Sequence, residues 1–260
     1  MIQTVLALAG VVIKELYRRK DFYVLFVLTA LITLVMGSVS FFHDDKIIRY
    51  VKELCLLLIW ISALVIAIGT TARQIPAERE NRTIFPLLAK PVTRAQVVIG
   101  KFAGCWLACG LALVMFYAFF AIVSGSRESH WPVVQLLQAM WLQWVMLAVV
   151  VALVLLGSVV FAAPSSNGTI CFVVVLGILL LGRYLNQVAL REPEPLRTVV
   201  YGLYYMIPHL EWYDIREFVV YDHAPIGWVS CGLASLYAAV YAALLLSATW
   251  LVFRRKPLNL

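Results

Sequence analysis

Few side chains in this 260-residue sequence have types and spacings that could support catalysis. The acidic candidates are Glu78 and Glu80, which flank Arg79. The base or metal-ligand candidates are the four histidines, His43, His130, His209 and His223. A hydrolytic metal site typically places two histidines one helical turn apart, and no His-x-x-x-His pattern occurs here. An intramembrane hydrolase is therefore the weakest of the functions that these residues suggest.

Two of the histidines suggest a metal-handling role of a different kind. His209 and His223 fall in one stretch that also holds Met206 and Asp222. Their separations do not match the ligand spacing of known metal motifs. We favour the interpretation that the histidines belong to a belt of aromatic residues at a membrane interface.

Nucleotide hydrolysis by this chain is not expected, since no G-x-x-x-x-G-K-[ST] phosphate loop occurs. Gly100-Lys101 is followed by Phe102, and the upstream glycine is missing. No cofactor is expected on this chain. The cysteines are odd in number and all fall in apolar stretches, so they predict no disulfide framework. They are Cys55, Cys105, Cys109, Cys171 and Cys231.

The composition predicts a polytopic membrane protein. Hydrophobic residues make up 63% of the chain and charged residues 13%, with a mean hydropathy of +0.91. Soluble domains hold about 45–50% apolar and about 25% charged residues. Six stretches reach the length of about 20 apolar residues that a spanning helix needs. They are residues 22–42, 54–71, 97–123, 133–163, 169–190 and 226–253.

The charges predict the orientation of these six spans. Of the 21 basic residues, 13 fall in the N-terminal segment, the segment after the second span and the C-terminal tail. The positive-inside rule then places both termini in the cytoplasm. The net charge of +7 is thus interpreted as a topology signal, and no nucleic-acid partner is expected. The apolar residues of segment 1–20 recur at helical spacing, which predicts an amphipathic interfacial helix. Packing of this segment against other helices is the alternative.

Residues 72–96 form the main cytoplasmic segment. Pro76 suits the first turn of a helix, Pro91 ends one, and Thr93 is a candidate N-cap for the next. The segment between them combines an apolar stripe with mixed charge, which favours docking to a cytoplasmic protein. By contrast, residues 163–168 are expected to form a short uncharged turn, and residues 43–53 a loop. Three glutamines in the fourth span, Gln135, Gln138 and Gln143, are expected to lie at an interface or to face other helices.

The cytoplasmic segment resembles the coupling-helix region of ABC-2-type exporter permeases. The resemblance rests on the run Glu78-x-Glu80-Asn81-Arg82-Thr83-Ile84-x-x-Leu87-Leu88-Ala89-x-Pro91-Val92-x-Arg94, then Gly100-Lys101. Many relatives have glycine where this chain has Asn81, a residue that tolerates similar turns. The fold implied is a single all-α transmembrane domain over residues 1–260 with six transmembrane helices. It includes an interfacial helix, a coupling helix between spans two and three, and a membrane-skimming helical segment at residues 191–225 outside.

The resemblance also implies partners. Two copies of a cytoplasmic ABC ATPase subunit would carry ATP and magnesium and dock on the coupling segment. A second permease subunit would complete the pathway, most simply as a homodimer in the cytoplasmic membrane of a prokaryote. The implied docking and coupling residues are Glu78, Arg79, Glu80, Arg82, Thr83, Phe85, Leu88, Pro91 and Arg94. Cargo exported by this family ranges from lipids and lipid-linked glycans to drugs and peptides, so the substrate class stays open.

The rival interpretation is a secondary transporter or a membrane scaffold without an ATPase partner. A proton-coupled transporter would be expected to carry acidic or histidine relays within its spans. The predicted spans contain none, and their glycines are scattered as in ordinary helix packing.

Overall fold

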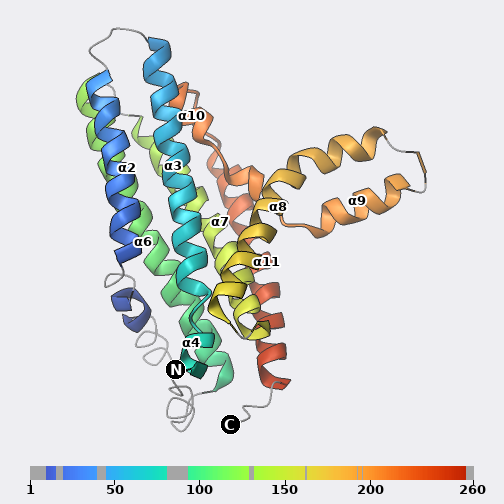
Figure 1. Ribbon diagram of the computed structural model, residues 1–260. Coiled ribbons are helices and arrows are strands. Elements are labelled where there is room, and N and C mark those ends of the chain that lie inside the picture. The colour runs from blue at the N-terminus through green and yellow to red at the C-terminus, as the bar shows by residue number, and fades with distance from the viewer. Residues whose placement is uncertain are drawn as a thin grey trace.

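The structure is a computed structural model of the chain. It describes residues 10–15, 20–39, 45–80, 93–128, 132–161, 163–191, 193–194 and 196–255. These residues form helices and turns, with no β-strand among them (Figure 1). The elements are α2 (Lys20–Val39), α3 (Asp45–Thr71), α4 (Pro76–Glu80), α6 (Arg94–Glu128), α7 (Val133–Val160), α8 (Pro164–Arg191), α9 (Leu196–Met206), the 3₁₀ helix η2 (Leu210–Tyr213), α10 (Arg216–Val220) and α11 (Trp228–Arg255).

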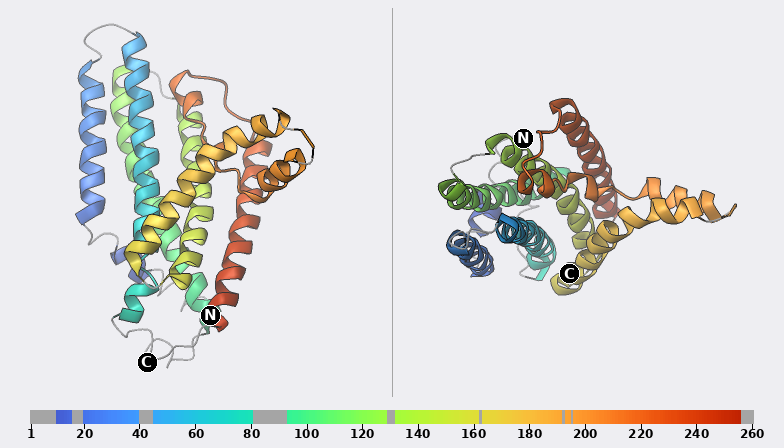
Figure 2. Two further views of the ribbon diagram at one scale, coloured as in Figure 1. Left: turned by 45° about the vertical axis from the view of Figure 1, so that its right-hand side comes forward. Right: turned by 90° about the horizontal axis from the view of Figure 1, so that it is seen from above.

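Five helices within the described residues are long and apolar enough to cross a membrane. These candidate spans are Arg49–Glu78, Arg94–Gly125, Val133–Val160, Pro164–Gly182 and Trp228–Arg255. Helix α2 lies where the sequence predicts the first of six spans and runs beside α3 and α6 (Figures 1 and 2). Its crossing of the bilayer, and with it the count of six, stays a prediction.

Helix α7 is the central helix of the bundle. It packs against α3, α6, α8 and α11, and 78% of its apolar span is buried inside the protein. The corresponding share is 22% for α8 and 17% for α11, so both present most of their surface outward. A helix that is apolar on every face suits such a central position, and α7 has no charged residue.

An interlocked pair of tryptophans joins α6 to α7. The Trp106 indole N–H donates to the Trp144 carbonyl oxygen (2.9 Å), and the Trp144 indole N–H donates to the Trp106 carbonyl oxygen (3.0 Å). The two rings stack with centroids 4.4 Å apart. Gly110 makes this approach possible, because a Cβ there would lie 2.6 Å from the Trp144 indole nitrogen. We refer to these three residues as the tryptophan clasp.

Two expected loops are shorter than predicted. The expectation of a turn over residues 163–168 was wrong, because α8 begins at Pro164. Proline fits the first helical position, where its missing N–H costs no hydrogen bond. Helix α3 likewise begins at Asp45, so most of the expected loop at residues 43–53 is helical. Charged residues in that part of α3 extend the helix beyond its apolar stretch.

The segment between α8 and α11 has three short helical elements. The end of α8 and α9 form a helical hairpin that projects from the bundle (Figures 1 and 2), whereas α10 packs on α3 and α7.

Gln138 of α7 anchors the chain before α11: its side-chain amide donates to the Ile226 carbonyl oxygen (2.7 Å) and accepts from the Ile226 N–H (3.0 Å). Gln143 accepts a hydrogen bond from the Tyr117 hydroxyl (2.9 Å). These two glutamines do face other elements of the chain. Gln135 also contacts the segment before α11, at Asp222 and the His223 carbonyl oxygen.

Candidate functional site

Both ends of the predicted docking segment, residues 72–96, lie in the described part of the chain. The side chains of Glu78 and Arg94 are described, and the backbones of Arg79 and Glu80 lie in α4. The remaining predicted residues, Arg82, Thr83, Phe85, Leu88 and Pro91, lie outside the described residues. The contacts expected of Arg79, Glu80 and these five therefore remain predictions.

A tight turn leads from α3 into α4. The Ala72 N–H still donates to the Ile68 carbonyl oxygen (2.9 Å), and the Ala77 N–H donates to the Arg73 carbonyl oxygen (3.0 Å). Helix α4 begins at Pro76, as the sequence predicts. Ile75, immediately before it, is 1% exposed and fixes the turn in the core.

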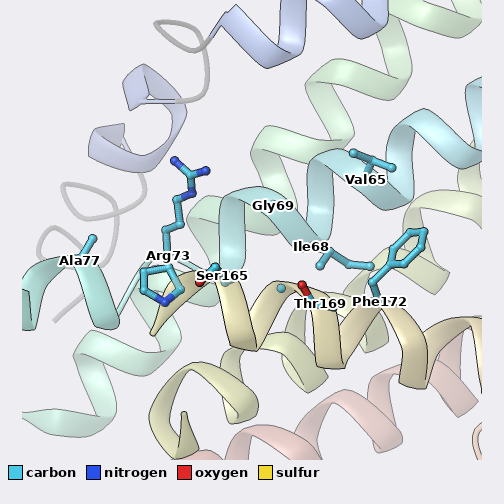
Figure 3. A pocket seen from close by; sticks show the side chains of 11 residues that line it. Val65, Ile68, Gly69, Arg73, Ala77, Ser165, Thr169 and Phe172 are labelled. Carbon is cyan, nitrogen blue, oxygen red and sulfur yellow. The ribbon is translucent and has the colours of Figure 1, made fainter. Parts of the chain in front are cut away.

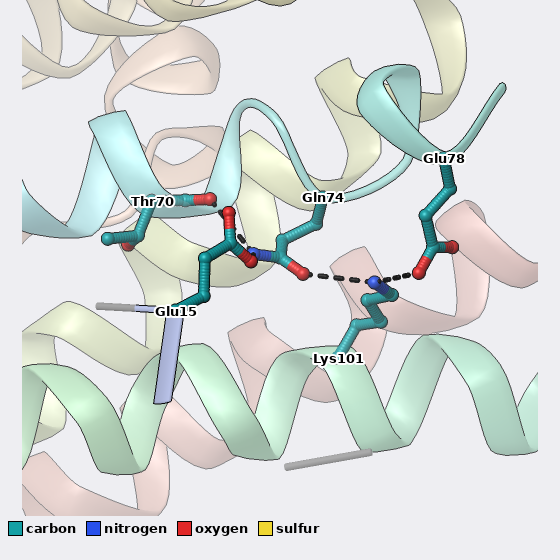
Figure 4. Close-up of polar contacts among 5 residues, drawn as sticks. All are labelled: Glu15, Thr70, Gln74, Glu78 and Lys101. Atoms are coloured by element: carbon teal, nitrogen blue, oxygen red, sulfur yellow. Dashed lines mark hydrogen bonds and ion pairs between the residues drawn. The ribbon is translucent and has the colours of Figure 1, made fainter. Parts of the chain in front are cut away.

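A buried polar cluster holds α4 against α6 (Figure 4). The Lys101 ammonium group donates to Glu78 Oε1 (2.5 Å) and to Gln74 Oε1 (3.0 Å). Lys101 is 5% exposed and Gln74 is 4% exposed. The structure shows Glu78 in contact with α6 of the same chain. The contacts that the sequence predicts for Glu78, with the ATPase and the interfacial helix, stay a prediction.

Gln74 extends this cluster to the N-terminal helical turn. Its side-chain amide donates to Glu15 Oε2 (3.3 Å) and to the Thr70 carbonyl oxygen (3.3 Å). Four segments therefore meet at one point: residues 10–15, the end of α3, α4 and α6. We call Glu15, Gln74, Glu78 and Lys101 the coupling cluster, and the end of the bundle that holds it the coupling end.

Burial makes this cluster energetically demanding. Removing one partner of a buried ion pair leaves a desolvated charge and costs about 3–5 kcal/mol. The Lys101 side chain is 7% exposed and that of Glu78 is 22% exposed. The cost here is therefore expected near the lower end of that range. Lys101 also keeps its hydrogen bond to Gln74, but Glu78 is the partner that balances its charge, so the pair holds α4 in place.

The segment returns to the bundle through a capping box at Thr93. The Gln96 N–H donates to the Thr93 hydroxyl (3.3 Å), and the Thr93 N–H donates to the Gln96 side-chain oxygen (2.9 Å). This reciprocal pair satisfies two backbone donors that the first helical turn would otherwise leave exposed. The prediction of Thr93 as an N-cap is confirmed.

Arg94 ties that same end to α11. Its guanidinium group donates to the carbonyl oxygens of Phe253 (2.6 Å) and Arg254 (3.0 Å). It also lies over the Phe253 ring, 5.4 Å from the centroid. A cation at a helix C-terminus satisfies free carbonyl groups and complements the helix dipole. Arg94, predicted as a docking residue, thus has a contact within the chain.

Asn167 joins the start of α8 to the start of the same segment. It is fully buried, and its amide donates to the carbonyl oxygens of Ala72 (3.2 Å) and Val154 (3.3 Å). Sequence reasoning did not single out Gln74 or Asn167, and it cited Lys101 only as part of the motif. A polar side chain next to an apolar run is the one signal that could have identified them.

The opposite end of the bundle holds a second set of polar groups. Asp214 accepts two hydrogen bonds from Arg216, both 2.7 Å, and the Arg216 guanidinium lies 5.6 Å from the Trp60 ring centroid. Burial lowers the pKa of Arg216, but the hydrogen bonds and negative charge of Asp214 outweigh it, so the net pKa is raised. Burial raises the pKa of the Tyr213 hydroxyl, which donates to the Ala234 carbonyl oxygen (2.8 Å).

Two of the four histidines lie near this end. His209 is 4% exposed, its Nδ1 lies 3.2 Å from Glu211 Oε1, and its ring contacts Tyr204 and Trp212. His223 stacks against the Tyr221 ring. Within the described ranges no three His, Cys, Asp or Glu side chains form a group that could hold a metal ion. His43 and His130 lie outside those ranges.

An all-helical bundle of apolar spans with a buried polar cluster at one end defines a multi-pass membrane protein. The family model for ABC-2 family transporter proteins matches residues 29–258. The chain therefore belongs to the ABC-2 transporter family, and it is an ABC transporter permease. Membership in this family implies a partnership with an ATPase subunit and with the membrane. No curated protein matches the chain.

Proposed function

We propose that this protein is the transmembrane subunit of an ATP-driven exporter. Two copies of a cytoplasmic ATPase subunit dock on residues 72–96 and drive alternating access of a homodimeric permease. The complex resides in the cytoplasmic membrane of a prokaryote, with both termini of this chain in the cytoplasm. ATP and magnesium are held by the partner subunits.

The observation that carries this proposal is how the coupling segment is anchored. At its start, Glu78 is paired with Lys101 of α6. At its end, Arg94 is bonded to the last turn of α11. A force on the residues between these anchors therefore acts on two spans, α6 and α11. A ligand shifts a conformational equilibrium only as far as it interacts differently with the two states. Because the segment is anchored to two spans, docking on it can favour one state of the permease over the other.

The tryptophan clasp supports transmission farther into the bundle. Lys101 and Trp106 lie on α6 little more than one helical turn apart, and Trp106 is bonded to Trp144 on the central helix. Displacement of α4 would therefore reach α7 through one rigid helix and one interlocked pair.

Co-purification and ATP hydrolysis together test the proposal. The full-length chain is co-expressed with its cognate ATPase subunit and purified in lipid nanodiscs. Glu80→Arg is expected to reduce the amount of ATPase recovered. Lys101→Gln is expected to leave recovery within about twofold, while the rise in hydrolysis on complex formation falls about tenfold, because the anchor and not the docking face is removed. Lys14→Gln, which removes an exposed lysine at the same end, is the matched control.

A charge swap sharpens the test. If the ion pair transmits motion, Glu78→Lys and Lys101→Glu should each impair hydrolysis, and the double variant should recover part of it. If no ATPase subunit co-purified with the natural chain, that result would favour a secondary transporter or a scaffold instead. Unchanged hydrolysis in Lys101→Gln would contradict the assignment of the coupling cluster.

A further inference from the structure

Helix α8 connects the coupling end of the bundle to the projecting hairpin. It is one continuous helix from Pro164 to Arg191, with no proline after its first residue. It runs obliquely across the bundle, and its end forms the hairpin with α9 (Figures 1 and 2). We call the part of α8 beyond Gly182, together with α9, the arm. Because rigid helices carry displacement along their length, α8 links the two regions mechanically.

Asn167 fixes the near end of α8 to two other elements. Its amide donates to the carbonyl oxygen of Ala72, which lies two residues before Gln74 of the coupling cluster, and to that of Val154 in α7. Gly157 of α7 makes room for this side chain, because a Cβ there would clash with Asn167 Oδ1. Asn167 is fully buried, so water cannot replace a lost bond. The start of α8 is therefore tied to the start of the coupling segment.

Glu211 fixes α8 at the root of the arm. Gly182 lies so close to this side chain that a Cβ on the glycine would clash with the carboxylate. Glu211 is held in turn by His209, whose Nδ1 lies 3.2 Å from Glu211 Oε1. The centroid of the His209 ring lies 4.3 Å from that of Tyr204 in α9. The two helices of the arm therefore meet at this point.

Between these two points α8 is loosely packed. A groove of about 770 Å³ separates it from the end of α3 (Figure 3). The groove is lined by Val65, Ile68 and Gly69 from α3 and by Thr169 and Phe172 from α8. A Cβ on Gly69 or on Gly177 would meet no atom within 4 Å, and only 22% of the α8 span is buried. A helix held at two points and loosely packed between them can shift without repacking the core.

We propose that α8 transmits displacement of the coupling segment to the arm, with Asn167 and Glu211 as the positioning residues at the two ends of this connection. When the segment moves, the bond to Ala72 moves the start of α8. The helix then shifts as one body on its contact with Gly157, and the contact with Glu211 moves the root of the arm. This inference rests on the proposed function, because a docked ATPase supplies the displacement.

The distance between two spin labels, measured by double electron–electron resonance, tests the proposal. One label is attached at Thr198→Cys in α9 and the other at Glu217→Cys in α10. Both positions are exposed, whereas the five natural cysteines are buried. The full-length chain is measured in lipid nanodiscs, alone and with its cognate ATPase, before and after trapping with ATP and vanadate. Trapping should shift the mean distance by about 2–5 Å, the size of helix displacements in allosteric transitions.

Three variants break the connection at its two ends. Asn167→Asp keeps the shape of the side chain but has no N–H to donate when ionised, and Gly157→Ala displaces Asn167 with a methyl group. Gly182→Ala displaces Glu211. Each should reduce the shift on trapping about fivefold. ATPase recovery and the ATP concentration for half-maximal hydrolysis should stay unchanged, because the partner holds ATP. A merely structural role would lower recovery together with the shift.

Matched controls add the same methyl group where it meets nothing. Gly177→Ala lies on α8 between the two fixed points, and Gly69→Ala lies on the α3 wall of the groove. Both should keep the full shift, and its loss in these controls would overturn the proposal. A full shift in both near-end variants would overturn the role of Asn167. A full shift in Gly182→Ala would overturn the role of Glu211.

The chain without its ATPase separates this inference from the proposed function. Asn167→Asp and Gly157→Ala should each already move the mean label distance by about 2 Å, because the start of α8 is released. Gly177→Ala should not. If no ATPase subunit co-purifies, the proposed function fails, and these distances still decide the connection through α8. Unchanged distances in both near-end variants would overturn it. These two variants change different helices, so one that fails to fold leaves the other to decide.

Discussion

The two ends of this bundle use buried polar groups in different ways. At the coupling end, the ion pair joins Glu78 of α4 to Lys101 of α6, 23 residues away in the chain. At the opposite end, the strongest pair is local, since Asp214 and Arg216 are two residues apart. A pair between distant segments holds helices together, whereas a local pair shapes one short segment. The first can transmit displacement between helices, and the second braces the cap formed by η2 and α10.

Contacts with backbone groups do not share this contrast, because they join distant segments at both ends. At the coupling end, Arg94 and Asn167 donate to carbonyl oxygens of segments far away in sequence. At the opposite end, Gln138 donates to the chain just before α11 and accepts from it. At both ends these buried polar side chains form hydrogen bonds, because a buried polar group without a partner is costly. The difference between the two ends therefore lies in their ion pairs.

The largest effect is expected from breaking the coupling cluster. Lys101→Met should lower the free energy of unfolding by about 3 kcal/mol, because Glu78 keeps its partly buried charge without its partner. Unfolding by sodium dodecyl sulfate in mixed micelles measures the change. Lys14→Met, at an exposed position, should stay within about 0.5 kcal/mol. Equal changes in the two variants would contradict the role of the buried pair in holding the coupling end together.

The tryptophan clasp should give the next largest effect. Gly110→Ala places a methyl group against the Trp144 indole and should cost about 1–3 kcal/mol through overpacking. Gly177→Ala, at an open position of α8, should instead be neutral or more stable by up to about 1 kcal/mol, because alanine is the better helix former. The same unfolding assay checks both. A stable Gly110→Ala variant with unchanged ATP hydrolysis in the complex would show that α6 and α7 need not move together.

A smaller effect is expected at the local pair. Asp214→Asn should lower the free energy of unfolding by about 1 kcal/mol, since the asparagine oxygen still accepts a hydrogen bond from Arg216, which retains its position over Trp60. ATP hydrolysis in the complex should stay within about twofold. Glu217→Gln, an exposed neighbour in α10, serves as the control. A loss of coupled hydrolysis as large as that of Lys101→Gln would sink the assignment of this end as a brace.

The smallest effect concerns pH. Burial raises the pKa of Tyr213 above its ordinary value of 10.0, so the folded protein keeps the hydroxyl neutral where the unfolded chain ionises it. This contribution is fully present below about pH 10 and is lost as the pH rises toward the folded pKa. Tyr213→Phe should cost about 1 kcal/mol near neutrality through the lost hydrogen bond to Ala234. The difference between the natural chain and the variant should narrow above about pH 10, which unfolding curves at several pH values would show. A constant difference would rule out the shift.

Local features of the sequence predicted local features of the structure. Apolar runs of sufficient length located the helices of the bundle, Pro76 marked the start of α4, and Thr93 marked the cap before α6. The resemblance of the coupling segment gave the family that the match over residues 29–258 confirms. Where prediction failed, at the turn after α7, the helix-starting role of Pro164 had been taken for a turn signal.

By itself, the sequence determined that this chain is a helical membrane protein, because hydropathy acts over neighbouring residues. That residues 72–96 face a partner stays a prediction. Only the tertiary structure decided that Glu78 pairs with Lys101, that Arg94 caps α11, and that Gly110 admits Trp144. These contacts join residues 23, 159 and 34 positions apart. No local pattern specifies such pairs, because they depend on which helix faces the packing of the whole bundle brings together.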